Sequence, residues 1–277
     1  MSVSRIKTLV LAVLALVNIF FLVLIISDTV ADARSERQAT QNVCSVLQAG
    51  GIIIDPDNVR ADNSLRPMKT ARGNEAEATI AGAVLGPTVT TVRGVIYEYE
   101  NAQNGIAVFY SGGDFEININ PGVITNTSGT VRVVQRLLRD MKIATSEIVL
   151  TGEPGSETVT VLSAYKGVGI LNCAIEFVFA GESLESIRGR YVAGPELVED
   201  GAGMSHVSTA LLGFLAAVRN EEREDVVCAR ILNVETGYRH HVVGSFGEGV
   251  IMPVWLLTTD TGKYVIDDAS GEIQLIA

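Results

Sequence analysis

The sequence predicts an α+β protein with one N-terminal transmembrane helix and an ectodomain of repeated units, each a helix followed by an antiparallel meander. Three observations predict this fold. One apolar run, residues 9–26, is long enough to cross a bilayer. Later segments with helical spacing of apolar residues alternate with groups of short strand-like runs. Glycine-rich turns separate those runs, as expected for antiparallel neighbours.

Composition narrows the class of protein before any motif is considered. The 277 residues are 47% apolar, which excludes disorder as the main state. No second apolar run could span a bilayer, so a polytopic transporter is excluded as well. The net charge of −11 argues against a nucleic-acid partner, because phosphates attract clustered basic side chains.

The apolar run 9–26 is the first expected element. It holds no charged residue and, at about 1.5 Å per residue, spans about 27 Å as a helix. Arg5 and Lys7 precede it, which predicts a cytoplasmic N-terminus, an anchor in the cell membrane and an extracellular C-terminal domain. A signal peptide cleaved after Ala33 is the alternative, but signal cores run to about 7–15 residues. We therefore predict an uncleaved anchor.

Three residues of the anchor are candidates for contact with a partner helix: Asn18, Phe20 and Phe21. An amide in the middle of a membrane either bonds to its own helix backbone or donates a hydrogen bond to a neighbouring transmembrane helix. The second reading makes Asn18 a partner-binding residue within the bilayer.

Four helices are expected in the ectodomain from the three- to four-residue spacing of apolar positions. They cover 33–50, 75–85, 130–143 and 205–220. Gly50-Gly51 ends the first and Gly86-Pro87 ends the second, as glycine and proline commonly do after a helix. The polar stretch 55–75 reads as a surface loop, and 195–204 as a linker.

Strands are expected after the last three helices. Alternating apolar residues and intervening glycines place them at 94–100, 105–110, 114–120, 157–166, 169–180, 186–193, 226–238, 249–258 and 263–267. The expected division is a tail and anchor at 1–28, an N-terminal lobe at 29–125, and a C-terminal lobe of two helix-meander units at 126–277.

Residue patterns point to binding rather than catalysis. Gly247-Glu248-Gly249 does not complete a phosphate-binding glycine motif, and Asp267 and Asp268 point to opposite faces of a strand. We expect no enzyme activity, no catalytic or metal site and no cofactor.

Cysteines and histidines fit the same expectation. The cysteines lie in apolar contexts and are expected to be buried: Cys44, Cys173 and Cys228. A disulfide between two of them is the alternative that the sequence also permits. Neighbouring histidines on a strand face opposite ways, so His240 and His241 do not suggest a metal site.

Trp255 and Tyr264 are the ectodomain residues considered for partner binding. Trp255 is the sole tryptophan of the chain. It is read either as a sheet residue packed on the last helix or as an exposed anchor at an interface, where tryptophan is enriched.

The C-terminal segment carries a family resemblance. Residues 252–260 form a Trp-bearing strand, Thr261-Gly262 make a turn, and the next strand runs into Asp268-Ala269-Ser270-Gly271-Glu272. This order resembles the closing hairpin of PepSY-type domains. The resemblance implies a PepSY-like α+β unit at the end of the chain.

The layout of the whole chain is similar to that of the YycH/YycI family, accessory regulators of an essential cell-wall histidine kinase in Firmicutes. The residues that carry this likeness are Arg5-Ile6-Lys7-Thr8, Val17-Asn18-Ile19-Phe20 and Leu47–Ile52. The resemblance implies a two-component regulatory protein that binds a sensor histidine kinase, with a paralogous accessory protein as a further partner. A PepSY-like protease inhibitor or chaperone-like binding module at the cell surface is the alternative.

Overall fold

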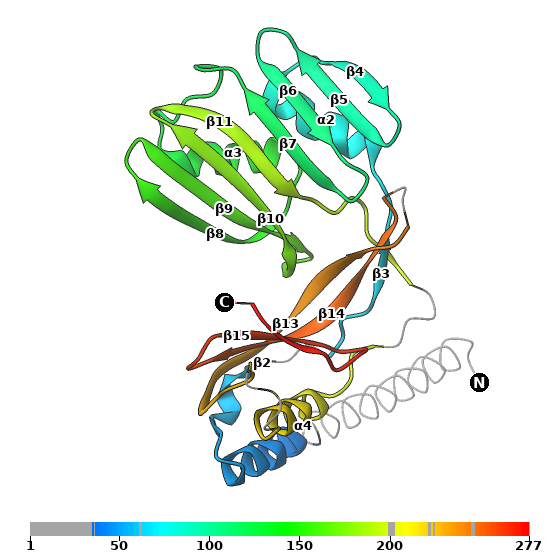
Figure 1. The fold of residues 1–277 in the computed structure, drawn as a ribbon, viewed down its shortest axis with the longest axis vertical. Helices are drawn as coiled ribbons and strands as arrows, with labels where there is room; N and C mark the ends of the chain where they lie inside the picture. Colours follow the sequence, from blue (N-terminus) through cyan, green and yellow to red (C-terminus); the bar gives the residue numbers. More distant parts are fainter. Residues whose placement is uncertain are drawn as a thin grey trace, which may run out of the picture.

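The computed structural model describes residues 35, 37–60, 63–198, 203–220, 223, 225–244 and 247–276. It shows a mixed α+β fold that consists mostly of sheet (Figure 1). The predicted anchor 9–26 lies outside the described residues, as do Asn18, Phe20, Phe21 and the alternative cleavage site at Ala33. None of the helices within the described ranges has the length and apolar character needed to span a bilayer.

Three helices are each followed by a four-stranded antiparallel meander. The first unit has α2 (Asn74–Leu85), β4 (Val89–Arg93), β5 (Ile96–Asn101), β6 (Gly105–Phe109) and β7 (Asp114–Ile119). The second has α3 (Thr130–Asp140), β8 (Thr145–Glu153), β9 (Ser156–Tyr165), β10 (Val168–Ala180) and β11 (Ser183–Arg190). The third has α4 (Val207–Val218), β13 (Arg230–Val242), β14 (Gly249–Thr259), β15 (Lys263–Asp267) and β16 (Ile273–Leu275).

Each unit contains one strand more than the sequence predicted. The added strands are β4, β8 and β16, and each pairs with a single neighbour among the strands that the structure describes. An edge strand buries few side chains, so its apolar residues need not alternate with polar ones. All five residues of β4 are exposed, which explains why its sequence carries no strand pattern.

Short elements complete the fold. A helix covers 37–49, and the chain then forms β1 (Ile53–Ile54), the 3₁₀ turn η1 (Pro56–Asn58), β2 (Val59–Arg60) and β3 (Met68–Thr70). The expectation of a loop over 55–75 was therefore wrong in part. The expected linker 195–204 also contains a strand, β12 (Glu196–Leu197), which pairs with β3.

The strands form two lobes that share one sheet path. We call units one and two the upper lobe, and the third unit with residues 37–70 the lower lobe (Figure 1). Within the upper lobe, β11 pairs with β7 and so joins the two meanders edge to edge. Between the lobes, β10 pairs with β13 in parallel through one register pair, Ile170 with Tyr238.

Two hydrophobic clusters follow these lobes. In the lower cluster, Leu47 and Ile52 pack with Phe214 and Trp255. In the upper cluster, side chains of α2 and α3 share one core with β5–β11. The clusters group the chain differently from the expected lobes 29–125 and 126–277, because the first two units merge their sheets and helix 37–49 packs beside the third.

Candidate binding site between the lobes

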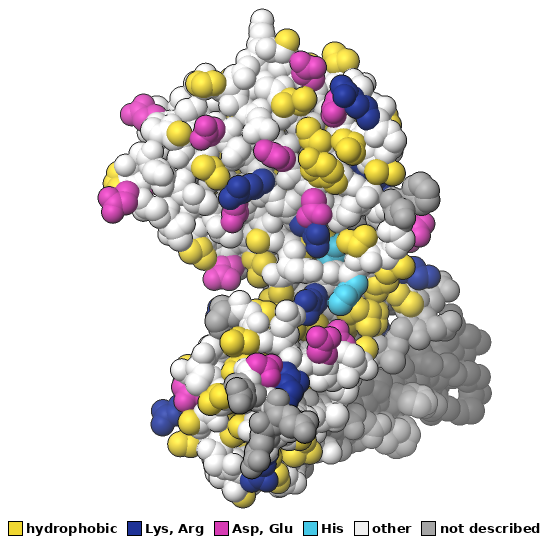
Figure 2. Space-filling model, viewed as in Figure 1, with side chains coloured by type: hydrophobic (Ala, Val, Ile, Leu, Met, Phe, Trp, Pro, Cys, Tyr) yellow, Lys and Arg dark blue, Asp and Glu magenta, His cyan; other side chains and the backbone are white. Residues whose placement is uncertain are grey.

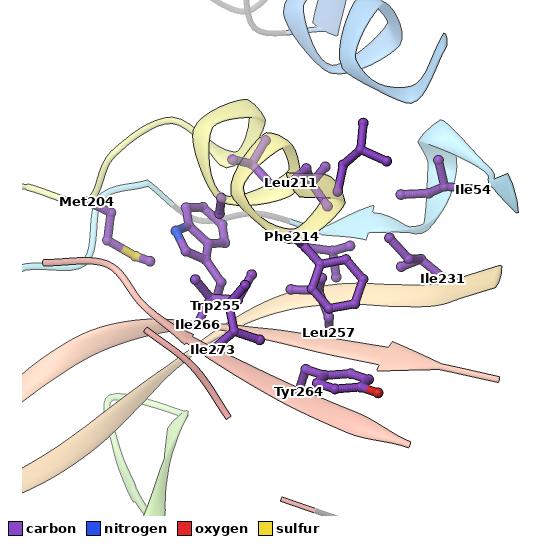
Figure 3. Close-up of a cluster of buried hydrophobic side chains, with 14 of the residues drawn as sticks. Ile54, Met204, Leu211, Phe214, Ile231, Trp255, Leu257, Tyr264, Ile266 and Ile273 are labelled. Atoms are coloured by element: carbon purple, nitrogen blue, oxygen red, sulfur yellow. The ribbon is translucent and has the colours of Figure 1, made fainter. Parts of the chain in front are cut away.

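Trp255 lies inside the lower lobe. Its side chain is 0% exposed and faces α4 among Leu211, Phe214 and Ile266 (Figure 3). The indole Nε1 donates a hydrogen bond of 3.0 Å to Asp268 Oδ1. Asp268 also accepts from the backbone N–H of Ser205, so its carboxylate ties β14 to the start of α4.

Tyr264 is buried on the same side of the sheet. It is 1% exposed, and its ring meets Phe214 edge to face with centroids 5.2 Å apart. Its hydroxyl donates to the Val227 carbonyl at 3.0 Å. Trp255 and Tyr264 are therefore core residues and not exposed anchors. Burial of their rings against α4 is favoured because it removes apolar surface from water. The sheet-residue reading of Trp255 is the one the structure shows.

The three cysteines are free and buried. Burial raises the pKa of both Cys173 and Cys228 to about 12, and it also raises that of Cys44. Such thiols stay protonated and act as small apolar side chains. Among the described residues, no three or more His, Cys, Asp or Glu side chains gather as a metal site would need.

A buried ion pair occupies the crossover from the lower to the upper lobe. Arg72 precedes α2, and its Nε donates to Glu77 Oε1 at 2.7 Å while its Nη2 donates to Glu77 Oε2 at 3.1 Å. The same guanidinium donates to the carbonyls of Val95 and Phe109 and lies 4.1 Å from the centre of the Tyr97 ring. Arg72 thus fixes the crossover to the upper lobe.

Asn172 extends the strand pairing between the lobes. Its Nδ2 donates to the His240 carbonyl at 2.7 Å, and the His240 N–H donates to Asn172 Oδ1 at 2.8 Å. The side-chain amide copies the pair of bonds that a neighbouring strand would make. Within the described residues, the sheets are therefore joined by one β10–β13 register pair, by the Asn172 amide and by the packing of Ile170 and Cys173 into the lower cluster.

Two of the hollows at this junction border the β9–β10 hairpin on its opposite faces. The first, which we call the seam cavity, has a volume of about 300 Å³ and is bounded by α2, the turn 141–144, the end of β9 and the crossover 191–195. The second, the polar groove, has a volume of about 560 Å³ and is lined by charged side chains that include Arg60, Glu147, Glu235 and Lys263. The surface view shows the molecule narrowing here between the lobes, with histidine side chains at the waist (Figure 2).

The β9–β10 hairpin separates the two hollows. Ser163 and Ile170 line the seam cavity, whereas Leu162 and Leu171 line the polar groove. Successive residues of a strand point to opposite faces, so one hairpin supplies walls to both hollows. A molecule bound in either hollow would contact the segment that connects the lobes.

Sequence reasoning missed the residues that build the junction. The signal for Ser163 was present, because it follows Val159 and Val161 on one face of a strand and replaces an apolar side chain by a hydroxyl. No comparable signal exists for Arg72 or Glu77, which read as ordinary surface charges until the fold places them.

Comparisons with known proteins assign no family. No protein-family model and no curated protein matches the sequence. Among solved structures, an uncharacterized protein from Eubacterium rectale aligns over 80% of this chain and 92% of its own, with a TM-score of 0.48 and 10% identity. The YpeB C-terminal domain of Bacillus megaterium aligns over 75% of this chain and 99% of its own, with a TM-score of 0.32 and 10% identity.

Proposed function

We propose that this protein is a membrane-anchored, extracytoplasmic accessory protein that binds a sensor histidine kinase controlling cell-wall metabolism and shifts its signalling equilibrium. The observation that carries the proposal is the junction: two hydrophobic clusters, with the sheets joined by the Ile170–Tyr238 register pair and the Asn172 amide, next to the seam cavity and the polar groove. Such a junction suits a module that binds between its lobes and responds by changing their relative orientation.

The path from the junction to the membrane supports the same role. Helix 37–49 follows the expected anchor closely in sequence and packs through Val43, Cys44 and Leu47 into the lower cluster. A change in lobe orientation would therefore act on a helix that leads toward residues 9–26. Confinement by an anchor also raises the local concentration of the ectodomain near a membrane partner.

The C-terminal hairpin supports a PepSY-like identity for the third unit. The Trp-bearing strand is β14, and the signature that begins at Asp268 follows β15. Asp268 accepts the indole hydrogen bond of Trp255, so the two most distinctive residues of the hairpin are direct partners.

Crosslinking of the full-length protein in its native membrane tests the proposal, with captured proteins identified by mass spectrometry. We expect a sensor histidine kinase, and we expect its capture to be lost when residues 9–26 are replaced by an unrelated transmembrane helix. Asn18→Leu in the intact anchor is the finer variant, and Asn172→Ala tests whether the junction affects kinase output. Capture of no kinase, or capture unaffected by the helix replacement, would contradict the anchor-dependent role.

A PepSY-like protease inhibitor or chaperone-like binding module is the second candidate, and the edge of the upper sheet favours it. Val89 in β4 is 73% exposed, and β4 pairs only with β5 among the described strands. Other apolar side chains gather on the surface of the same lobe (Figure 2). An extended peptide could add to this edge through backbone hydrogen bonds.

Inhibition assays with secreted proteases separate this candidate from the first. The full chain should inhibit a protease or protect an unfolded substrate, and Thr91→Pro in β4 should abolish the effect because proline disturbs strand pairing at an edge. The corresponding change in an exposed turn, Ser128→Pro, is the control. An effect that survives Thr91→Pro would exclude strand addition at β4.

A further inference from the structure

We propose that the seam cavity is a binding site for a carboxylate-headed amphiphile, with the carboxylate at Lys142 and Ser163 and the apolar body against α2, the β9–β10 hairpin and the crossover 191–195. This inference goes beyond the regulatory role proposed above and does not depend on which protein is the partner. It rests on the volume of the cavity, the chemistry of its lining and a buried hydroxyl that has no partner.

Ser163 is the observation that points to a ligand. Its side chain is 5% exposed, and its Oγ is a buried atom that finds no hydrogen-bond partner among the described residues. Val159 and Val161 precede it on the same face of β9 and are fully buried. A hydroxyl in such a place is costly unless something pairs with it, and Ser163 belongs to the wall of a cavity large enough to hold that partner. Its Oγ is closed to solvent in this structure, so binding requires the hydroxyl to turn toward the cavity.

The charge in the lining selects the sign of the ligand. Lys142 is the one charged side chain among the residues lining the seam cavity, and no carboxylate lines it. None of the ion pairs found in the described part of the chain involves Lys142. The ammonium group is therefore available for an anionic head.

The local backbone brings Lys142 and Ser163 to the same end of the cavity. Lys142 lies in the turn 141–144 that connects α3 to β8, and Thr145 at the start of β8 is the register partner of Ser163. The N–H of Ala164 also donates to the Ala144 carbonyl at 2.8 Å, which holds the turn against β9.

The end of α3 presents few unpaired carbonyls at this position. The carbonyls of Leu137, Leu138 and Arg139 accept hydrogen bonds from the N–H groups of Met141, Ile143 and Lys142 respectively. These bonds satisfy three of the last-turn carbonyls. The partial negative charge of the helix end is therefore opposed by the Lys142 ammonium alone among the residues that line the cavity.

The remaining walls suit an alkyl chain. They are mainly apolar and come from α2, the hairpin and the crossover: Ala76, Ile80, Tyr165, Ile170, Val192 and Pro195. Ile170 belongs to the lower cluster and Ile80 to the upper cluster. An alkyl chain in this space would bury apolar surface against one member of each cluster, Ile170 and Ile80, and pockets of about 300 Å³ and above are typical of small-molecule sites.

Titration with sodium octanoate tests the proposal. The full chain is placed in lipid nanodiscs, and binding is followed by calorimetry with every variant in the same discs, so that partition into the bilayer cancels in the comparison. Octanol and octylammonium are the matched probes without charge and with opposite charge. We expect saturable binding in the order octanoate, octanol, octylammonium.

Variants of α2 and the turn assign the binding to the seam cavity. Ala76→Phe places a ring in the cavity and should abolish the saturable binding, whereas Ala78→Phe on the exposed face of the same helix should leave it intact. Ala144→Phe, at an exposed position on the cavity wall, is the second blocking variant in case Ala76→Phe does not fold. Trp255 fluorescence and circular dichroism verify folding of each.

Two further variants test the head-group assignment. Ser163→Ala should weaken octanoate binding about fivefold through loss of one hydrogen bond. Lys142→Gln should remove the preference for octanoate over octanol. Binding that is unchanged in both Ala76→Phe and Ala144→Phe would overturn the proposal, as would octylammonium binding as tightly as octanoate.

Discussion

Replacement of Arg72 by methionine should destabilise the protein far more than loss of a surface arginine. Glu77 is 1% exposed and Arg72 is 12% exposed, so the substitution leaves a carboxylate in the protein interior without its cation. The two hydrogen bonds to Glu77 are charge-assisted, and each contributes roughly 1.5–3 kcal/mol. Removal of one partner of a buried pair costs about 3–5 kcal/mol, which we take as the expected loss in the free energy of unfolding.

Arg188→Met provides the matched control. Arg188 forms an ion pair of similar length with Glu176, at 2.8 Å, but the two side chains are 64% and 39% exposed. Exposed pairs contribute about 0–1 kcal/mol. The two variants lose the same chemical group from the same lobe and differ mainly in burial.

Urea unfolding followed by circular dichroism measures both variants. Trp255 fluorescence, which reports on the lower lobe, shows in the same samples whether the lobes unfold together. Arg72→Met combined with Glu77→Leu should recover part of the loss, because the second change removes the unpaired carboxylate. A cost for Arg72→Met no larger than that for Arg188→Met would refute the reasoning.

Three other outcomes follow from the structure. Burial lowers the pKa of His240, so the unfolded chain binds a proton more readily than the folded chain does. The free energy of unfolding should therefore fall as the pH drops below about 6.5. Urea unfolding from pH 7.5 to 5.5 should show a weaker pH dependence of this free energy for His240→Gln than for the unchanged protein. Gly105→Ala should lower the melting temperature more than Gly122→Ala does. Both glycines have positive φ, but a Cβ at Gly105 would lie 2.1 Å from the Asn118 carbonyl oxygen, whereas Gly122 faces open space. Equal melting temperatures of the two variants would contradict this. Cys173 is 0% exposed and burial raises its pKa to about 12, so iodoacetamide should label it only through opened or unfolded states, far more slowly than a free thiol. Labelling of the folded protein at the rate of a free thiol would contradict this.

Much of the secondary structure was readable because its signals are local. The helices at 75–85, 130–143 and 205–220 correspond to α2, α3 and α4, since apolar residues at three- to four-residue spacing mark the buried face of a helix. Nine of the expected strands correspond to β5–β7, β9–β11 and β13–β15 for the equivalent reason of alternation. The edge strands were missed because they bury too little to leave an alternating pattern.

The candidate site could not be read in the same way. Arg72, Ser163 and Asn172 belong to three different elements, and their contacts join residues far apart in the chain. Whether a charge or hydroxyl is buried depends on which sheet edges meet, and no local pattern records that choice. The same limit made Trp255 ambiguous between a core residue and an exposed anchor until its burial against α4 was known.

The sequence by itself determined the α+β class, the helix-then-meander order of the units, and the expectation of an apolar anchor at 9–26. These features are readable because hydrophobic periodicity and the length of an apolar run are set by residues close together in the chain. Only the tertiary structure decided that β11 pairs with β7, that helix 37–49 packs with α4, and that the lobes meet at β10 and β13. These choices depend on the complementarity of whole surfaces, and the seam cavity forms where α2, the turn 141–144, the β9–β10 hairpin and the crossover 191–195 come together from distant parts of the chain.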